Sequence, residues 1–220
     1  MSQPTEVNEA LHRYVAEHTR RDDAFLRDLR TAARTEGLPP IDLDPTAMRL
    51  VTILLAAAGA KEVVEVGTLG GYSAISMARA LPRTGRVRTI EVEPTHAEFA
   101  RRWVNRSDVS GKVEVLLGRG LDVLATFAAA SADAAMVDAD KESYPAYLEQ
   151  LRRVVKPGGL IFIDNAFAFG QLLDGGSRGP EVEAIRKVND QVAQARDLDG
   201  VLVPLGDGLW VIRVTGVGCR

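Results

Sequence analysis

The chain has 220 residues, a formal net charge of −3 and one cysteine, Cys219. This length suits a single domain with a sizeable core, and the mixed charge argues against nucleic acid or an anionic membrane as a partner. A single cysteine excludes an intramolecular disulfide, and the start of the chain lacks the basic and apolar regions of a signal peptide, so we expect a cytoplasmic protein. The longest apolar run, residues 51–60, is too short to span a membrane.

The N-terminal stretch, residues 5–36, is predicted to be helical because apolar residues such as Leu11, Tyr14 and Leu26 recur at helical spacing. Polar clusters at 17–23 and 35–40 interrupt the pattern. The stretch could form a lid over a site, a dimer surface or a layer packed on the core. We expect residues 1–40 to be a helical extension, 41–214 the catalytic core of a single domain, and 215–220 a tail.

After this extension, helix and strand signals alternate to the end of the chain. Repeated βαβ units predict a Rossmann-like α/β fold, with a mostly parallel sheet and helices on both faces. Only residues 205–208 separate the last two strands, so one of them should run antiparallel. The expected strands are 62–66, 86–91, 113–117, 134–137, 160–163, 201–204 and 209–214, and the expected helices are 45–58, 72–80, 94–106, 121–129, 144–154 and 180–195.

The first strand runs into a glycine-rich turn, Gly67-Thr68-Leu69-Gly70-Gly71. The dinucleotide fingerprint G-x-G-x-x-G places a glycine where Leu69 stands, because the backbone must touch a pyrophosphate there. Its absence favours a nucleoside ligand without phosphates. The turn could also be an ordinary tight connection between a strand and a helix.

Two acidic residues at the ends of the first two strands also favour a nucleoside ligand. Glu91 ends the second strand, where an acid can accept hydrogen bonds from both ribose hydroxyls. Glu65, near the end of the first strand, could meet a cationic amino group. Together with the glycine-rich turn, these acids indicate a nucleoside-binding crevice.

Oxygen ligands follow two later strands. Asp138-Ala139-Asp140-Lys141 comes directly after one strand, and Asp164-Asn165 after the next. Parallel strands deliver such groups to one edge of the sheet, where carboxylate and amide oxygens would suit Mg²⁺ or a similar hard cation. Each motif alone could be a solvated loop, an ion pair or a turn.

Several motifs in order resemble the cation-dependent O-methyltransferases, the catechol and caffeoyl-coenzyme A type enzymes that use S-adenosylmethionine. The resemblance covers about residues 40–214. It rests on Glu65-Val66-Gly67-Thr68, Gly71-Tyr72-Ser73, Thr89-Ile90-Glu91, Val137 to Lys141, Pro157-Gly158-Gly159, Asp164-Asn165 and Gly206-Asp207-Gly208-Leu209. The family implies a seven-stranded sheet with a reversed last strand, and commonly a homodimer.

The resemblance also implies roles for individual residues. The cation (Mg²⁺, with Ca²⁺ or Mn²⁺ as alternatives) would be held by Asp138, Asp164 and Asn165. Lys141 lies where the family places its general base, although it could instead neutralise Asp138 or Asp140. A lysine beside a divalent cation can accept a proton, because the cation disfavours the ammonium form. The cofactor S-adenosylmethionine would be bound by Leu43, Glu65, Gly67, Thr68, Ser73, Glu91, Gly120 and Asp140, with Asp140 against its methionine part or the substrate.

The chain departs from the family pattern at two positions. Gly118-Arg119-Gly120 replaces the usual Gly-Asp-Ala, so a cation stands where relatives carry an acid near the adenine. Phe167 and Phe169 follow Asn165 where relatives often place a tryptophan, which alters the apolar wall beside the acceptor. The segment 173–180 is expected to help frame that acceptor.

The sequence therefore predicts an S-adenosylmethionine- and cation-dependent O-methyltransferase acting on a small, catechol-like aromatic hydroxyl. One rival is a nicotinamide-dependent oxidoreductase, against which Leu69 and the absence of a Tyr-x-x-x-Lys motif argue, since Leu148 lies four residues after Tyr144. A nucleobase N-methyltransferase would need an Asn/Asp-Pro-Pro-aromatic turn. A non-catalytic cofactor-binding protein would have no need of Lys141 and the complete ligand set.

Tyr144, Tyr147 and Trp210 are expected to pack in the core, and His12, His18 and His96 to lie on the surface.

Overall fold

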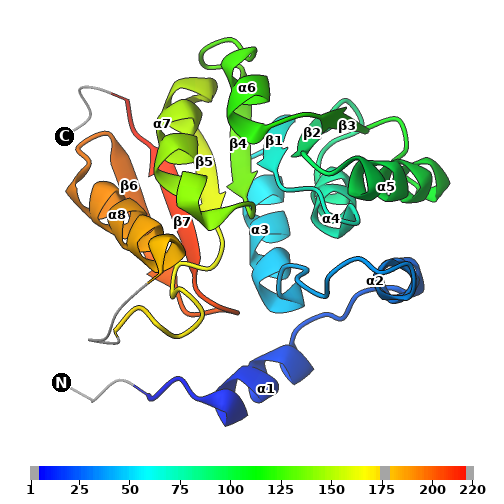
Figure 1. Cartoon of the computed structure of the whole chain (residues 1–220), viewed down its shortest axis with the longest axis horizontal. Coiled ribbons are helices and arrows are strands. Elements are labelled where there is room, and N and C mark those ends of the chain that lie inside the picture. The colour runs from blue at the N-terminus through cyan, green and yellow to red at the C-terminus, as the bar shows by residue number, and fades with distance from the viewer. Residues whose placement is uncertain (1–4, 174–178, 217–220) are drawn as a thin grey trace.

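We describe the protein from a computed structural model in which residues 5–173 and 179–216 are described. A seven-stranded sheet with strand order β3-β2-β1-β4-β5-β7-β6 forms its centre (Figure 1). Strands β1 to β5 pair in parallel, whereas β7 is antiparallel to both β5 and β6. This confirms the predicted sheet and its reversed last strand. The strands are β1 (Glu62–Val66), β2 (Arg86–Glu91), β3 (Val113–Leu117), β4 (Ala132–Val137), β5 (Val155–Ile163), β6 (Leu198–Val203) and β7 (Leu209–Val214).

Helices cover both faces of the sheet (Figure 1). Successive side chains of a strand point to opposite faces, so Val63 and Val64 of β1 enter two separate apolar cores. The first core is completed by α2 (Ala24–Thr35), α3 (Pro45–Ala57), α4 (Tyr72–Ala80) and α5 (Pro94–Arg106). The second is completed by α6 (Gly120–Ala125), α7 (Tyr144–Val154) and α8 (Pro180–Gln194), and the short 3₁₀ helix η1 (Lys141–Ser143) leads into α7.

The predicted N-terminal helical stretch is two helices, α1 (Glu9–His18) and α2. The side chain of Asn8 caps α1 by accepting a hydrogen bond from the Leu11 amide, and Asp23 caps α2 in the same way. The α1 helix has no buried residue, and Tyr14 is 58% exposed on it. Figure 1 shows α1 at the edge of the molecule, where it contacts α3.

The prediction of a helix over 121–129 is wrong at its C-terminal end, because α6 stops at Ala125. The guanidinium group of Arg153 donates hydrogen bonds to the carbonyls of Leu124 (2.9 Å) and Phe127 (2.6 Å), which holds this part of the chain in a turn. Of the predicted acceptor-framing segment, residues 174–178 lie outside the described residues, as does Cys219. Within the described ranges, no helix is long and apolar enough to cross a membrane.

The register of the central strands brings the predicted site residues to one edge of the sheet. Val66 of β1 pairs with Val137 of β4, and Val137 pairs with Ile163 of β5. The residue that follows each of these strands therefore lies at the same level. The Asp138 amide donates to the Val66 carbonyl, and the Asp164 amide donates to the Val137 carbonyl, each at 3.0 Å.

Gly67 is required where β1 ends beside β4. Its φ is +99°, a conformation that side chains disfavour, and a Cβ here would lie 1.9 Å from the carbonyl oxygen of Asp138. No rotation of a side chain can relieve a clash with backbone. The two strand ends can approach each other only because this residue is glycine.

We predict that Gly67→Ala lowers the free energy of unfolding by about 3 kcal/mol or more, the sum of backbone strain and overpacking. Gly37→Ala is the matched control, because Gly37 has a similar φ of +87° but open space around the position of its Cβ. That variant should lose only about 1 kcal/mol. Urea unfolding of both variants measures the difference, and equal losses would contradict the proposed clash.

Candidate active site

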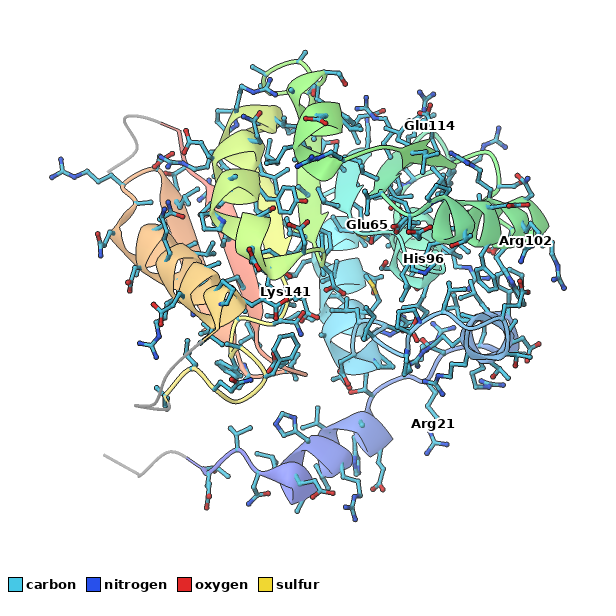
Figure 2. The ribbon with its side chains drawn as sticks, viewed as in Figure 1. Arg21, Glu65, His96, Arg102, Glu114 and Lys141 are labelled. Carbon is cyan, nitrogen blue, oxygen red and sulfur yellow. The ribbon has the colours of Figure 1, made fainter. Side chains whose placement is uncertain are left out.

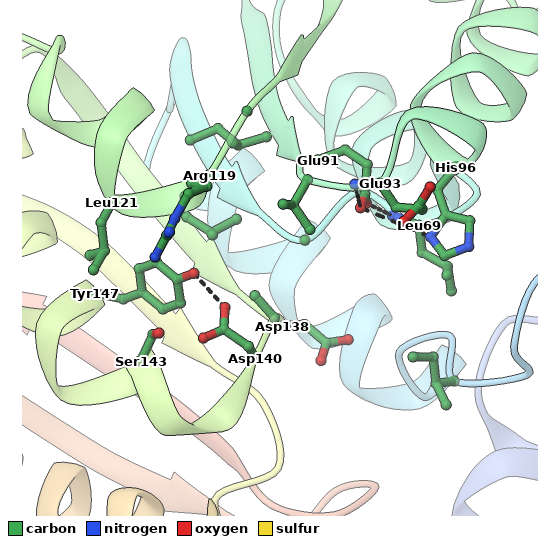
Figure 3. Close-up of a pocket in the computed structure, with 18 of the residues that line it drawn as sticks. Leu69, Glu91, Glu93, His96, Arg119, Leu121, Asp138, Asp140, Ser143 and Tyr147 are labelled. Atoms are coloured by element: carbon green, nitrogen blue, oxygen red, sulfur yellow. Dashed lines mark hydrogen bonds and ion pairs between the residues drawn. The ribbon is translucent and has the colours of Figure 1, made fainter.

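A cavity of about 590 Å³ opens at this edge of the sheet, where the strand order reverses between β1 and β4. Open α/β sheets bind their ligands at this switch point, and the volume is in the range of small-molecule sites. Figure 3 shows its lining, with Glu91, Glu93 and His96 toward one side and Arg119, Leu121 and Tyr147 toward the other. Of the predicted cofactor residues, Gly67, Glu91, Gly120 and Asp140 line this cavity.

The carboxylate of Glu91 is held by the glycine-rich turn. Its Oε2 accepts hydrogen bonds from the amides of Thr68 (3.2 Å) and Leu69 (2.8 Å), and its Oε1 accepts one from the amide of Glu93 (2.9 Å). Leu69 adopts φ +47°, so the chain makes its left-handed turn at the position where the dinucleotide fingerprint has glycine. The turn and the strand-end acid thus form one hydrogen-bonded unit.

Glu65 lies behind this turn and is almost completely buried, with 1% of its surface exposed. Figure 2 shows Glu65 on β1. The pKa of the carboxyl group is raised to about 7, chiefly by burial; hydrogen bonds from Ser73 and Thr89 oppose the rise, and the negative charges of Asp138 and Glu91 add to it. The Thr89 hydroxyl donates to the carboxylate at 2.6 Å. A cationic ligand beside this group would stabilise its charged form.

Asp140 and Gly120 meet at the opposite side of the cavity. The hydroxyl of Tyr147 donates to Asp140 Oδ1 at 2.5 Å, shown as a dashed line in Figure 3. A Cβ on Gly120 would lie 2.7 Å from the Tyr147 ring, so glycine lets the ring pack directly on the backbone. Tyr147 is therefore both a core residue, as predicted, and part of the cavity wall.

A second cavity, of about 90 Å³, adjoins the first and shares Gly67, Leu69 and Asp138 with its lining. It is also lined by the remaining predicted cofactor residues except Glu65, namely Leu43, Thr68 and Ser73, and by the predicted base Lys141. Most of the residues that were predicted to form the site therefore line one or both of the two cavities. Asp164 and Asn165 line neither of them.

Lys141 forms an ion pair with Asp138, with its Nζ 2.8 Å from Asp138 Oδ1. The side chain of Lys141 is only 11% exposed and that of Asp138 is 23% exposed. Figure 2 shows Lys141 beside the start of α7. Of the two acids that Lys141 could neutralise, it contacts Asp138, whereas Asp140 is bound by Tyr147.

Asp164 is buried and has one carboxylate oxygen, Oδ1, without a hydrogen-bond partner. Burial raises the pKa of this carboxyl group, and the negative charges of Asp138 and, less strongly, Asp207 raise it further, while the Asn165 backbone and Lys141 lower it. An unpartnered buried carboxylate next to a second acid is an arrangement that a hard cation would stabilise. The donor set of two carboxylates and the Asn165 amide fits Mg²⁺ or a similar ion.

Among the described residues, no three His, Cys, Asp or Glu side chains are grouped closely enough to hold a metal ion. A cation at Asp138 and Asp164 would therefore need a neutral ligand such as Asn165 as its third protein ligand.

Among the lining residues that were not assigned to the site from the sequence are His96 and Tyr147. His96, predicted to lie on the surface, is 23% exposed at its side chain and its Nδ1 is 3.9 Å from Glu91 Oε1. Tyr147 was assigned to packing alone. A histidine in the first turn of α5 and a tyrosine on α7 give no sequence signal for a cavity wall, because these two helices come together only when the complete sheet has formed. Trp210 is buried as predicted.

The sheet order, the reversed β7 and the glycine-rich turn at the switch point define a fold of the Rossmann-like class. The sequence matches the O-methyltransferase family over residues 16–215, so the chain belongs to this family. It is an S-adenosylmethionine-dependent O-methyltransferase. This membership does not favour the rival assignments to an oxidoreductase, a nucleobase methyltransferase or a non-catalytic protein.

Similar proteins agree with this assignment. A catechol O-methyltransferase of Niastella koreensis is 34% identical over 84% of this chain and 84% of its own length. A catechol O-methyltransferase of Mycobacterium tuberculosis is 35% identical over 83% of this chain and 82% of its own length. The crystal structure of an O-methyltransferase from Bacillus cereus in complex with SAH is 31% identical, with a TM-score of 0.85, and the match covers 94% of this chain and 97% of that one.

The raised pKa of Glu65 predicts a pH-dependent stability of the cofactor-free protein. Below the ordinary pKa of 4.5 the group is protonated in both the folded and the unfolded state, whereas above the folded pKa of about 7 the folded state must bury a charge. The free energy of unfolding should therefore fall by about 3 kcal/mol as the pH rises from 4.5 to 7. Glu65→Gln should remove this contribution, whereas the fall that comes from Asp164, whose pKa is also raised, should remain.

Urea unfolding between pH 5 and 8 measures the effect. Glu62→Gln is the control, because Glu62 lies on the same strand with its side chain 39% exposed. A plot of the free energy of unfolding of Glu62→Gln against pH should run parallel to the plot for the native protein. If Glu65→Gln also ran parallel to the native protein, burial of the Glu65 charge would not cost stability.

Proposed function

We propose that this enzyme transfers the methyl group of S-adenosylmethionine to one hydroxyl of a small catechol-like aromatic, in a reaction that depends on a divalent cation. The observation that carries the proposal is the group formed by Asp138, Asp164 and Lys141. Two acids stand on adjacent strand ends, one with a buried unpartnered oxygen, and the lysine Nζ lies 2.8 Å from the other.

The cofactor would occupy the two adjoining cavities. The hydrogen bonds that hold Glu91 use three of about four acceptor positions on its carboxylate, so the ribose hydroxyls would share the remaining capacity. The amino group of the cofactor would balance the charge of Glu65. Leu43, Gly67, Thr68 and Ser73 would enclose the methionine part, whereas Gly120 and Asp140 line only the larger cavity.

Asp138, Asp164 and Asn165 would hold the cation. When bound, a divalent cation lowers the pKa of a hydroxyl that it contacts and can hold both oxygens of a vicinal diol. Lys141 would take the acceptor's proton on its Nζ, and the oxygen lone pair would then form the new bond to the methyl carbon as the carbon–sulfur bond breaks. No covalent intermediate with the enzyme is needed, so positioning and charge neutralisation supply the acceleration.

Exposed apolar side chains support an aromatic acceptor. Ile41, which is 65% exposed, borders both cavities, and Phe169, which is 53% exposed, lies in the loop that follows Asn165. Large apolar side chains left in solvent beside a polar site are typical of surfaces that a ligand covers. Two relatives named catechol O-methyltransferase favour the same class of acceptor.

We predict that Asp138→Ala lowers turnover more than about 100-fold and removes its dependence on the cation, since it deletes a charged ligand. The assay follows methyl transfer to catechols, hydroxycinnamoyl thioesters and flavonoids, with Mg²⁺ or with excess chelator. The monohydroxy analogue of each acceptor should be a poor substrate, because it lacks the second oxygen. Asp199→Ala removes an exposed charge on β6 and should behave as the native protein. Full native activity in excess chelator would refute the cation requirement. Equal rates with phenol and catechol would refute the requirement for two neighbouring hydroxyl groups on the acceptor.

Two substitutions of Lys141 separate its possible roles. A general base contributes about 10²- to 10⁴-fold, so Lys141→Met should lower kcat by that amount. Lys141→Arg keeps the positive charge beside Asp138 but cannot accept a proton. If Lys141 is the base, Lys141→Arg stays as inactive as Lys141→Met in single-turnover measurements; if it only neutralises Asp138, Lys141→Arg recovers most of the rate.

A further inference from the structure

The loop that follows β5, residues 164–169, has a strained backbone. Asn165, Ala168 and Phe169 all adopt left-handed conformations, with φ values of +57°, +52° and +56°. Such conformations are costly for residues with side chains, and they persist only where surrounding contacts hold them. This loop carries the proposed cation ligand Asn165 and the exposed ring of Phe169, so what holds the loop also positions both.

The turn between β6 and β7 holds this loop. The backbone amides of Ala166 and Phe167 donate to the carbonyls of Gly208 and Asp207, each at 2.9 Å. The carboxylate of Asp207 reaches further into the loop, where its Oδ2 accepts a hydrogen bond from the Phe169 amide at 2.8 Å and a longer one from Asn165 Nδ2 at 3.4 Å. One oxygen therefore joins two of the three left-handed residues.

The glycines on either side of Asp207 explain how the turn comes so close. A Cβ on Gly208 would lie 2.8 Å from the ring of Phe167, and a Cβ on Gly206 would lie 2.9 Å from Cβ of Asp44, the cap of α3. Both glycines also have positive φ. The Gly-Asp-Gly sequence is thus enclosed between α3 and the loop, with the aspartate as its only side chain.

We propose that Asp207 is a positioning residue that orients Asn165 for the cation. A carboxylate can only accept hydrogen bonds, so it selects the NH₂ end of the Asn165 amide and leaves the carbonyl oxygen as the end available to a metal ion. An unrestrained amide could present either end. The inference rests on the proposed cation site and assigns to the Gly206-Asp207-Gly208 turn a role in it.

Asp207 acts through Asn165 rather than as a further ligand. If Asp138, Asp164 and Asp207 converged on one point, they would form a group of three acids able to hold a metal ion, and the described residues contain no such group. The contacts of Asp207 are instead to the side chain of Asn165 and to the backbone of the loop.

The test measures Mn²⁺ binding by the full-length protein, from the loss of the free-ion signal in electron paramagnetic resonance. Removal of a group that orients a ligand costs about 10- to 100-fold in metal affinity, so Asp207→Ala should raise the Kd for Mn²⁺ by that factor. Asp207→Asn keeps one acceptor oxygen and should recover part of the affinity. Asp199→Asn, which removes an exposed charge from the same hairpin, should bind Mn²⁺ as the native protein does.

Two further readouts separate positioning from general damage. The affinity for S-adenosylmethionine should change less than threefold in Asp207→Ala; an equal loss of cofactor and Mn²⁺ binding would overturn the proposal. In metal-free protein, the side-chain amide NMR signals of Asn165, identified by their absence in Asn165→Asp, should move toward those of a free amide in Asp207→Ala. Unchanged amide signals or unchanged Mn²⁺ affinity would each overturn it. A native protein that binds no Mn²⁺ would instead refute the cation site itself, and the amide signals would still report whether Asp207 orients Asn165.

Discussion

The register between β1, β4 and β5 is the constraint on which the site depends. Because Val137 pairs with both Val66 and Ile163, the residues that follow the three strands, Gly67, Asp138 and Asp164, must lie beside one another. A slip of one residue would turn these side chains to the other face of the sheet. Gly67 makes the arrangement possible, since any Cβ there would meet the backbone of Asp138. The backbone hydrogen bonds of the sheet therefore hold Asp138 and Asp164 next to each other.

This arrangement concentrates negative charge in a place that is poorly hydrated. Burial raises the pKa of both Glu65 and Asp164, and Asp138 raises each further. Lys141 offsets part of this charge through Asp138 but does not contact Asp164 Oδ1, which has no partner. Two apolar cores, one on each face of the sheet, supply the stability that such a site costs. Positively charged ligands would relieve the repulsion, so binding and folding are linked.

The sequence predicted the strands, most helices and the acids at the strand ends, because these features are local: apolar periodicity, helix caps and the residue that follows a strand. It could not predict contacts that arise when distant segments meet. The bond between Tyr147 and Asp140 joins a helix to a strand end, and the carboxylate of Asp207 reaches the loop of Asn165 from a hairpin 42 residues further along the chain. The end of α6 was missed for the same reason, since Arg153 comes from another helix. Whether α1 is a lid or a dimer surface stays a prediction, as does the homodimer.

The contrast between local features and contacts of distant segments also applies to the proposed site, where the residues proposed for the reaction differ from those proposed for acceptor choice. Asp138 and Asp164 stand directly on the ends of paired strands, where backbone hydrogen bonds fix them. Phe167 and Phe169 stand on a loop whose conformation depends on a few contacts from the β6–β7 turn. Changes in that loop can therefore alter the wall that we propose for the acceptor without moving the strand ends. The residues proposed to carry the reaction stand on strand ends and can be named from a sequence pattern, whereas the side chains proposed to select the acceptor are placed only by the folded chain.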